Sequence, residues 1–405
     1  MEKFRKLVKA CLAQEISDLH LAGGHPVVCR RHGQLFVQKD MVFSPQEVDL
    51  LVGTLLNPRQ KGVLRTRWSV DLALSLQGAR LRLNIFSTLR GLSLAVRFLP
   101  GKVPSLEQLN LLPDLKELAA LRSGLVLFCG ATGSGKTTTI AALIGEINRT
   151  RAAHIVTLED PVEYRMPSLR SFVEQREHGV HFPTYEQGLL DVLRQAPDVI
   201  VVGELRKAET IRLTLNAAES GHLVFATLHA ATAEESGYRM CNAFSPESQE
   251  FVRFQLSTCL AAVVVQQLVF LERQGFRVPL LSVAKGTPAL RSLIRENRLT
   301  QVESALETNK AQGMFTFARY RTEFLDQKPV FTPPSVCFRP SPETAPEPTH
   351  LSPLIDYDAG LPSHPLVPAA ASRPDADGGG ILDVTEEADL EDLIASYEKR
   401  APGMG

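Results

Sequence analysis

The sequence lacks both a large net charge and closely spaced cysteines, and each absence argues against a class of protein. Its 44 basic and 45 acidic residues give a net charge of -1, so no overall field draws the chain to nucleic acid or acidic lipid, and we expect no nucleic-acid partner. The six cysteines lie far apart and form no C-x-x-C motif, which argues against zinc and favours reduced thiols in a cytoplasmic protein. We therefore expect any partner to be recognised by a specific site and not by the overall charge of the protein.

The chain also lacks a long hydrophobic segment. Its first residues, MEKFRKL, contain no apolar region of the kind that a signal peptide needs. The longest apolar stretch, Leu260–Leu271, is interrupted by Gln266 and Gln267 and is too short to span a bilayer. We therefore expect any membrane association to come through a partner.

The length predicts more than one domain. Single hydrophobic cores usually stop growing near ~250–300 residues, and this chain has 405. Hydrophobic residues make up 44% of it and charged residues 22%, a balance typical of a globular protein.

The most specific feature that is present is the run GATGSGKT at residues 130–137, a complete G-x-x-x-x-G-K-[ST] phosphate loop. The apolar run 125–129 before it is typical of a buried parallel strand, and 138–147 has apolar residues at helical spacing. Lys136 should reach the outer phosphates of a nucleotide, and the Thr137 hydroxyl should bind Mg²⁺. The predicted nucleotide-binding residues are Gly130, Ala131, Thr132, Gly133, Ser134, Gly135, Lys136, Thr137 and Thr138.

Strands alternate with helices from this loop to about residue 285, which predicts a parallel sheet with covered faces. The expected strands are 125–129, 154–158, 199–202 and 222–228. In open α/β sheets, ligands bind beyond the carboxyl ends of the strands, so the polar residues there are candidates for chemistry. They are Glu159 and Glu163 after the second strand, Glu204 after the third, and His229 after the fourth, with His222 at the start of the fourth.

Hydrolysis of a phosphoanhydride needs a group that activates water, a cation that offsets developing charge, and an acid that holds the hydration shell of a metal. Glu204 and Glu163 are candidates for water activation and for the Mg²⁺ shell, with Glu159 as a further metal candidate, and His229 is a candidate sensor of the γ-phosphate. Each has an alternative interpretation. Acidic residues at strand ends often cap the next helix, and a lone histidine is more often a packed or surface residue.

Residues 1–98 have a mixed pattern of helices and strands. We expect helices at 3–16, 45–56 and 58–64, and β-rich runs at 27–31, 34–37, 70–76, 80–86 and 93–98, with a hairpin turn at 32–33. Alternation along 80–86 puts Arg80 and Arg82 on one face of a strand, with Arg97 nearby. This group is either a solvated basic face or a set of planar donors for phosphates bound by another subunit.

The last third of the chain changes character. We expect helices at 257–271 and 314–324, and Thr287 followed by Pro288 should begin another. Residues 328–380 hold 12 of the 26 prolines, which predicts a disordered linker. Apolar residues at helical spacing within 381–405 predict a short acidic amphipathic helix, which is either a tail without a partner or a docking peptide.

Four segments resemble, in order, the Walker A, Asp, Walker B and His boxes of the type II/type IV secretion ATPase superfamily. They are residues 130–137, 157–163, 193–204 and 217–229. Within that superfamily the chain is similar to the type IV pilus retraction ATPases, the PilT and PilU group, because it lacks the extra amino-terminal domain and four-cysteine module of many assembly ATPases. Residues 286–296 also resemble the A-I-R-N-L-I-R-E element associated with retraction. Residues 194–198 and 226–230 are closer to PilU than to PilT, so the subtype stays open.

The resemblance implies an α/β fold: a RecA-like P-loop NTPase core at 113–285, preceded by a smaller PAS-like α+β domain at 1–98 and a linker at 99–112. A helical segment at 286–326, a proline-rich linker at 327–380 and an acidic tail at 381–405 complete the expected organisation. It also implies a cytoplasmic homohexamer that uses ATP and Mg²⁺ and binds an inner-membrane platform protein at the pilus base. A paralogous pilus ATPase is a further candidate partner.

The resemblance extends to basic residues that face phosphates across subunits. Arg82 and Arg97, together with Arg80 and Arg239, match such positions. The chain departs from the family at Ala196 and Lys207, where acidic residues are usual, and neither departure removes a group needed for hydrolysis.

The sequence therefore predicts a hexameric ATPase that powers pilus retraction in twitching motility. Three alternatives stay open: a pilus assembly or type II secretion ATPase, a non-catalytic subunit that modulates a paralogous retraction ATPase, and a DNA translocase. The presence of Lys136, Glu163, Glu204 and His229 argues against the second alternative. The near-neutral charge argues against the third.

Overall fold

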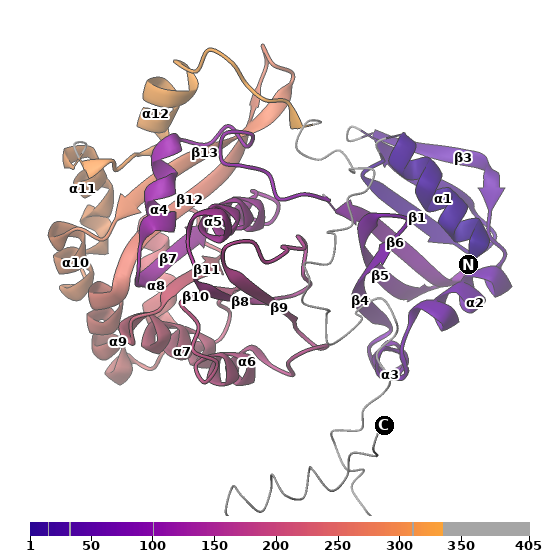
Figure 1. The fold of residues 1–405 in the computed structure, drawn as a ribbon, viewed down its shortest axis with the longest axis horizontal. Coiled ribbons are helices and arrows are strands. Elements are labelled where there is room, and N and C mark those ends of the chain that lie inside the picture. The colour runs from indigo at the N-terminus through magenta and orange to yellow at the C-terminus, as the bar shows by residue number, and fades with distance from the viewer. Residues whose placement is uncertain (15, 32–33, 100, 310–311, 335–405) are drawn as a thin grey trace, which may run out of the picture. The chain divides into compact units, whose positions relative to one another are not determined.

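The computed structural model describes residues 1–14, 16–31, 34–99, 101–309 and 312–334, and within them the chain forms two β-sheets (Figure 1). The predicted hairpin turn at 32–33, most of the predicted linker and the acidic helix at 381–405 lie outside the described residues. The predicted domain limits at residues 98, 112, 285 and 326 stay a prediction.

The amino-terminal sheet has six antiparallel strands in the order β3-β2-β1-β6-β5-β4. Alternation along β5 agrees with the sequence, because Leu81, Leu83 and Ile85 are fully buried and the residues between them are partly exposed. The strands are β1 Asp18–Ala22, β2 Pro26–Arg31, β3 Gln34–Val42, β4 Ser69–Leu76, β5 Ala79–Thr88 and β6 Gly91–Leu99.

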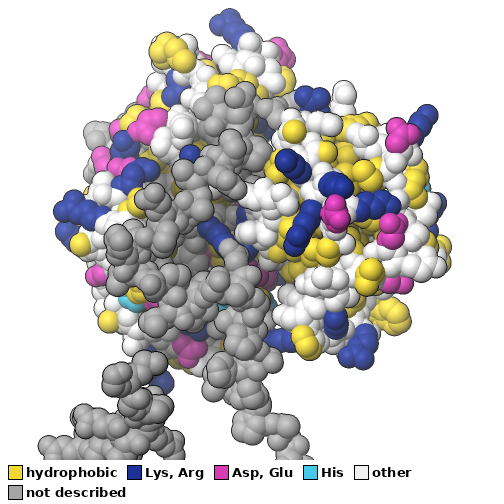
Figure 2. Space-filling model, turned by 45° about the vertical axis from the view of Figure 1, so that its right-hand side comes forward, with side chains coloured by type: hydrophobic (Ala, Val, Ile, Leu, Met, Phe, Trp, Pro, Cys, Tyr) yellow, Lys and Arg dark blue, Asp and Glu magenta, His cyan; other side chains and the backbone are white. Residues whose placement is uncertain are grey.

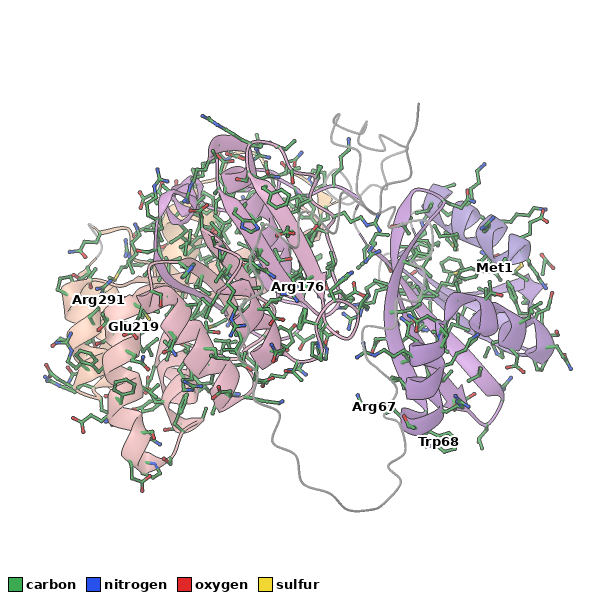
Figure 3. All side chains as sticks on the ribbon, turned by 60° about the horizontal axis from the view of Figure 1, so that its bottom comes forward. Met1, Arg67, Trp68, Arg176, Glu219 and Arg291 are labelled. Carbon is green, nitrogen blue, oxygen red and sulfur yellow. The ribbon has the colours of Figure 1, made fainter. Side chains whose placement is uncertain are left out.

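Three helices accompany this sheet: α1 Glu2–Ala13, α2 Pro45–Leu55 and α3 Pro58–Arg67. The first residues of α2 and α3 form capping boxes, in which Ser44 pairs with Glu47 and Asn57 pairs with Gln60. Trp68 ends α3 in the left-handed conformation, with φ 61°, and 69% of it is exposed (Figure 3). The predicted helices of this region are therefore confirmed.

The second sheet has seven strands in the order β13-β12-β7-β11-β10-β8-β9. All neighbours pair in parallel except β12 and β13, which are antiparallel. The four predicted strands are confirmed, and the sheet adds three that the sequence did not predict. The strands are β7 Gly124–Cys129, β8 His154–Glu159, β9 Phe172–Glu177, β10 Val199–Val202, β11 Leu223–Leu228, β12 Leu260–Leu271 and β13 Phe276–Lys285.

Helices cover both faces of this sheet (Figure 1). Leu125 and Leu127 of β7 pack in one hydrophobic cluster with α7, α8 and α9, whereas Val126 and Phe128 pack in a second cluster with α5. Strands buried on both faces read as continuous apolar runs, as β7 does. The helices of this region are α4 Lys116–Ala120, α5 Lys136–Thr150, α6 Tyr185–Val192, α7 Ala208–Glu219, α8 Ala233–Asn242 and α9 Pro246–Cys259.

The predicted helix at 257–271 is wrong, because α9 ends at Cys259 and the chain continues as strand β12. The residues of β12 between Ala262 and Val265 are all buried, so the run is apolar on both faces. A continuous apolar run of this kind does not distinguish a buried strand from a buried helix by its periodicity.

The helix predicted to begin at Thr287 and Pro288 is confirmed as α10 Pro288–Arg295, and the Thr287 side chain accepts a hydrogen bond from the Leu290 N–H. After α11 Val302–Thr308, the predicted helix at 314–324 begins later than expected. It consists of α12 Phe317–Arg319 and a π-helix at Tyr320–Leu325.

Within the described ranges, no helix has the length and hydropathy that a bilayer crossing requires. On the face shown in Figure 2, basic, acidic and apolar side chains are interspersed.

Candidate active site

A cavity of about 950 Å³ opens beyond the carboxyl ends of β7, β8, β10 and β11. This volume is in the range of sites that hold small molecules and cofactors. Six of the nine predicted phosphate-loop residues line it, and so do the four candidates Glu159, Glu163, Glu204 and His229. The six are Thr132, Gly133, Gly135, Lys136, Thr137 and Thr138. The structure therefore brings together residues that the sequence spreads over about a hundred positions.

Three residues of the phosphate loop have a backbone conformation that only glycine adopts easily. Gly130, Gly133 and Gly135 have φ values of 138°, 78° and 92°. A Cβ atom on Gly130 would also overlap the carbonyl oxygen of Gln266, and one on Gly135 would lie 2.7 Å from the Gln266 side-chain nitrogen. Both conformation and space therefore require glycine at these two positions.

Lys136 begins helix α5 and is only 8% exposed. Its Nζ atom donates hydrogen bonds to the Gly130 oxygen at 2.8 Å and the Ala131 oxygen at 2.9 Å. Burial lowers the pKa of Lys136, and the nearby charge of Glu204 opposes that shift. The end of the loop thus presents a partly desolvated cation and the amino terminus of a helix, a combination that binds anions.

Gln266 on β12 supports the loop, and the sequence did not predict this role. It is 1% exposed, donates to the Ser134 oxygen at 2.7 Å and accepts from the Thr139 hydroxyl at 2.8 Å. The only signal in the sequence was an amide in the middle of an apolar run. A buried amide needs hydrogen-bond partners, but the sequence does not reveal which ones.

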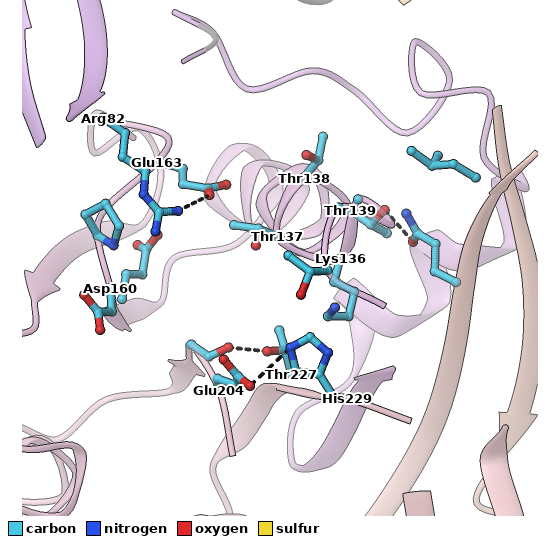
Figure 4. Close-up of a pocket in the computed structure, with 18 of the residues that line it drawn as sticks. Arg82, Lys136, Thr137, Thr138, Thr139, Asp160, Glu163, Glu204, Thr227 and His229 are labelled. Atoms are coloured by element: carbon cyan, nitrogen blue, oxygen red, sulfur yellow. Dashed lines mark hydrogen bonds and ion pairs between the residues drawn. The ribbon is translucent and has the colours of Figure 1, made fainter. Parts of the chain in front are cut away.

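Glu204 follows β10 and has a partner on each carboxylate oxygen. His229 Nε2 lies 3.2 Å from Oε1 (Figure 4), and Arg206 donates to Oε2 at 2.6 Å. The parallel pairing of β10 with β11 places Val202 beside Ala226, which brings the residues after both strands to the same edge. The Thr227 hydroxyl donates to the Gly203 oxygen and links the two strand ends. The Glu204 carboxylate is therefore held in a fixed position in the cavity.

Glu159 differs from the other two carboxylates in its environment. Its Oε1 atom accepts hydrogen bonds from the Thr157 hydroxyl at 2.6 Å and the Gln175 amide at 3.1 Å. Burial raises the pKa of Glu159 to about 7. Burial also raises the pKa of Glu163, but the charges of Arg82 and Arg97 oppose that shift. Glu163 is thus the better candidate for a charged carboxylate.

Arg82 and Arg97 both line the cavity. They lie directly opposite one another on β5 and β6, and like charges in such a pair are unfavourable unless anions offset them. Asp18 accepts from Arg97 at 2.8 Å, and Glu163 lies 4.0 Å from Arg82 (Figure 4). Because both cations belong to the same chain as the cavity, this contact does not require a second subunit. The predicted contribution in trans stays a prediction.

Three of the predicted catalytic residues do not line the cavity. Arg80 forms an ion pair with Glu177 at 3.4 Å, and Arg239 on α8 pairs with Glu235 one turn earlier at 2.7 Å. His222 precedes β11, so it lies at the opposite end of that strand from His229, about 20 Å away at the usual rise of a strand. His222 and Arg239 therefore have no place in this cavity, and their predicted roles stay predictions that would need the site of another subunit.

The donor set fits a magnesium ion. Among the described residues, no group of three or more His, Cys, Asp or Glu side chains is arranged to hold a metal. Mg²⁺ usually keeps several waters and is bound by one or two protein oxygens together with substrate phosphates, so it does not need such a group. Thr137, Glu163 and Glu204 offer oxygen atoms in the same cavity.

The raised pKa of Glu159 predicts a pH dependence of stability. The folded chain holds a proton on this carboxyl that the unfolded chain releases between pH 4.5 and about 7, so the carboxyl makes the protein less stable as the pH rises through that range. Glu159→Gln keeps an oxygen acceptor for Thr157 and Gln175 but does not titrate. We expect the variant to match the parent near pH 4.5 and to exceed its free energy of unfolding by about 1–3 kcal/mol near pH 8.

Denaturant unfolding without nucleotide at a series of pH values measures this difference. Glu272→Gln, in the exposed turn between β12 and β13, is the control and should track the parent at every pH. A difference between Glu159→Gln and the parent that is the same at all pH values would contradict the assignment.

The chain is similar to known proteins, among them ATPases of type IV pili. The Escherichia coli protein YggR, described as uncharacterized, is 42% identical over 313 residues, which cover 77% of this chain and 95% of that protein. The type IV pilus retraction ATPase PilT of Pseudomonas aeruginosa is 39% identical over 306 residues, covering 75% of this chain and 88% of PilT. The crystal structure of the pilus retraction motor PilT with bound ADP superimposes with a TM-score of 0.70 at 35% identity, covering 80% of this chain and 97% of that one.

The likeness to the PilT structure confirms the predicted fold class, a mixed α/β protein with a parallel sheet in which an amino-terminal domain precedes an ATPase domain. A family model matches residues 67–314, more than half of the chain. These residues include the phosphate loop, Glu163, Glu204 and His229. The chain belongs to the type II/IV secretion system protein family.

Proposed function

We propose that this protein is an ATPase motor that hydrolyses ATP with Mg²⁺ to power the retraction of type IV pili. The observation that carries the proposal is the placement of Glu204. Its carboxylate is held by His229 and Arg206 in the same cavity as the phosphate loop, and its charge acts on Lys136. A fixed carboxylate beside a phosphate site is what water activation requires.

The residues divide the work between binding and chemistry. The backbone N–H groups of the loop and Lys136 bind the phosphates, and Glu204 takes up the proton of the attacking water. His229 orients Glu204 and is placed to respond to the terminal phosphate. Thr137 and Glu163 would hold Mg²⁺, which when bound offsets negative charge on the phosphates.

Arg82 and Arg97 provide positive charge at the cavity that can interact with the phosphates of a nucleotide. Planar guanidinium groups suit phosphate oxygens, and the two arginines lie side by side on β5 and β6 with Asp18 and Glu163 as partners that phosphate oxygens can replace. We propose a homohexamer in which these arginines reach the nucleotide of a neighbouring subunit. In the alternative arrangement, Arg82 stays in contact with Glu163 of its own chain and Arg97 with Asp18.

Retraction as the output rests on similarity to PilT and on the element at 286–296. Helix α10 in this element is anchored to the strand that supports the phosphate loop, because Arg291 donates to the Leu260 oxygen at 3.2 Å and the Gly286 oxygen at 2.8 Å. A change at the nucleotide therefore has a direct physical connection to α10 through β12. We propose that the motor works in the cytoplasm at the inner-membrane pilus base, on a platform protein and with a paralogous ATPase as a candidate partner. The choice between the PilT and PilU subtypes stays open.

Glu204→Gln tests the catalytic assignment. The amide keeps the shape of the side chain but cannot accept a proton, so we expect ATP turnover to fall by about 100-fold or more while ATP binding persists. Glu219→Gln, at the end of α7 and outside the cavity (Figure 3), is the control and should keep full turnover. Equal turnover in Glu204→Gln and the parent would exclude this residue as the base. A parent that binds ATP without turnover would favour the non-catalytic accessory role.

A mixing experiment distinguishes arginines that act in trans from arginines that act in cis. Arg82→Ala and Lys136→Ala should each be inactive alone. In mixed rings, an Arg82→Ala subunit has an intact phosphate loop and can receive Arg82 from a Lys136→Ala neighbour, so turnover should recover to about one quarter of the parent in an equal mixture.

The control mixture combines Lys136→Ala with Glu204→Gln, which both disable the phosphate-loop side of the site and should show no recovery. Absence of recovery in the first mixture, with mixed hexamers demonstrated by mass, would show that Arg82 acts within its own chain.

Deletion of the gene distinguishes retraction from assembly. Loss of a retraction motor should leave excess pili on the cell surface and abolish twitching, and the parent gene should reverse both effects where the Glu204→Gln gene does not. Electron microscopy of surface pili measures the outcome. Cells without pili would instead show that the motor drives assembly or secretion.

A further inference from the structure

The cavity extends past the phosphate loop along strands β12 and β13. Gln266 contacts the loop, and Leu268 lies two residues further on the same face of β12, about 7 Å away at the usual rise of a strand. Leu268 pairs with Pro279 of β13, and both line the cavity. This part of the cavity is therefore at the distance from the phosphates where the nucleoside of a bound nucleotide would lie.

A segment from beyond the family region closes this end of the cavity. The family model ends at residue 314, yet Thr332 and Pro334 line the cavity together with Gln108, Leu109 and Asn110. The wall is thus made by residues that lie some two hundred positions apart in the sequence.

Asn110 fastens this segment in place. Its side-chain nitrogen donates to the Thr332 oxygen at 2.8 Å, and its side-chain oxygen accepts from the Thr332 N–H at 2.8 Å. Asn110 is 4% exposed and has φ 60°, a left-handed conformation that asparagine tolerates better than most residues. A buried asparagine with both polar groups committed to one backbone unit specifies the position of that unit.

Other contacts hold the chain on the way to Thr332. Tyr320 is fully buried, and its hydroxyl accepts from the Leu112 N–H at 3.1 Å, close to Asn110 in the sequence. Phe331 packs against the hydrophobic cluster that contains α5. The Lys328 ammonium lies 5.3 Å from the Phe324 ring centre and 5.9 Å from that of Phe331. The segment is therefore packed against the ATPase core by several independent contacts.

We propose that Phe331–Pro334, fastened by Asn110, forms a wall of the nucleoside subsite and positions the base and ribose of the nucleotide. This inference rests on the proposed function of the cavity as an ATP site. Leu268, Pro279 and Pro334 provide apolar contact for a flat base, and the Arg277 guanidinium adds a planar polar group. Asn110 acts through Thr332, because its polar atoms are already occupied, and is a positioning residue.

Two substitutions break the fastening in different ways. Asn110→Gly removes the amide and keeps a residue that accepts φ 60°, and Thr332→Pro removes the N–H that Asn110 accepts. Val330→Ala is the control, because Val330 belongs to the same segment and is 75% exposed. All three are made in the full-length protein.

Titration calorimetry with ADP and with inorganic pyrophosphate provides the test. Pyrophosphate has no base or ribose, so it reports the phosphate loop alone. We expect Asn110→Gly, which loses both hydrogen bonds to Thr332, to weaken ADP binding by about tenfold, and Thr332→Pro, which loses one of the two, to weaken it by a smaller factor. Pyrophosphate binding should change by less than about twofold, because that ligand does not reach the wall. Val330→Ala should match the parent with both ligands.

Unchanged ADP affinity in both variants would overturn the inference while leaving the ATP site intact. A parallel loss of ADP and pyrophosphate affinity would also overturn it, because the damage would then lie in the phosphate loop. If the parent protein binds neither ligand, the proposed function itself fails.

Discussion

Two hydrogen bonds of the Gln266 amide determine where the phosphate loop lies. The nitrogen donates to the Ser134 oxygen and the oxygen accepts from Thr139, so a loop with three glycines at positive φ is fixed to β12, the second strand from one edge of the seven-stranded sheet. A glycine loop by itself is conformationally free, and that freedom would have to be lost on binding a nucleotide. Gln266 restrains the loop before a nucleotide binds. Because Gln266 belongs to β12, the strands that pair with β12 also determine the geometry of the phosphate site.

Burial of charge is the second constraint on the site. Lys136 and Glu163 are both in surroundings that disfavour their charged forms, and in each case an opposite charge works against that effect, Glu204 for Lys136 and the two arginines for Glu163. Removing one partner therefore alters the other through electrostatics even where the two do not touch. Lys136 of the phosphate loop is thus coupled to Glu204 after β10, and Glu163 after β8 is coupled to the arginines of β5 and β6.

The sequence predicted the parts of the site that depend on local pattern. The phosphate loop lies between an apolar strand and a helix, and Glu204 and His229 follow directly after strands, so parallel pairing was sufficient to bring them together. Strand β12, Gln266 and Asn110 could not be predicted, because their roles depend on partners more than a hundred residues away, and neither hydrophobic period nor motif encodes such a pairing. His222 was correctly placed at the start of its strand, and that position keeps it out of the cavity at the other end.

The cavity receives residues from segments that are remote in the sequence: β5 and β6 of the amino-terminal sheet, the phosphate loop with its neighbouring strand ends, and the segment at Thr332. A ligand shifts a conformational equilibrium only by the difference in its contacts with the two states. A nucleotide that touches all these segments can make such a difference at each of them, whereas inorganic phosphate would touch only the loop. Arg82 and Arg97 also line the cavity, so in the proposed function they would respond to a change in the charge of bound phosphates. In the proposed function, the cavity is thus the place where cleavage of one bond would be converted into relative motion of these segments.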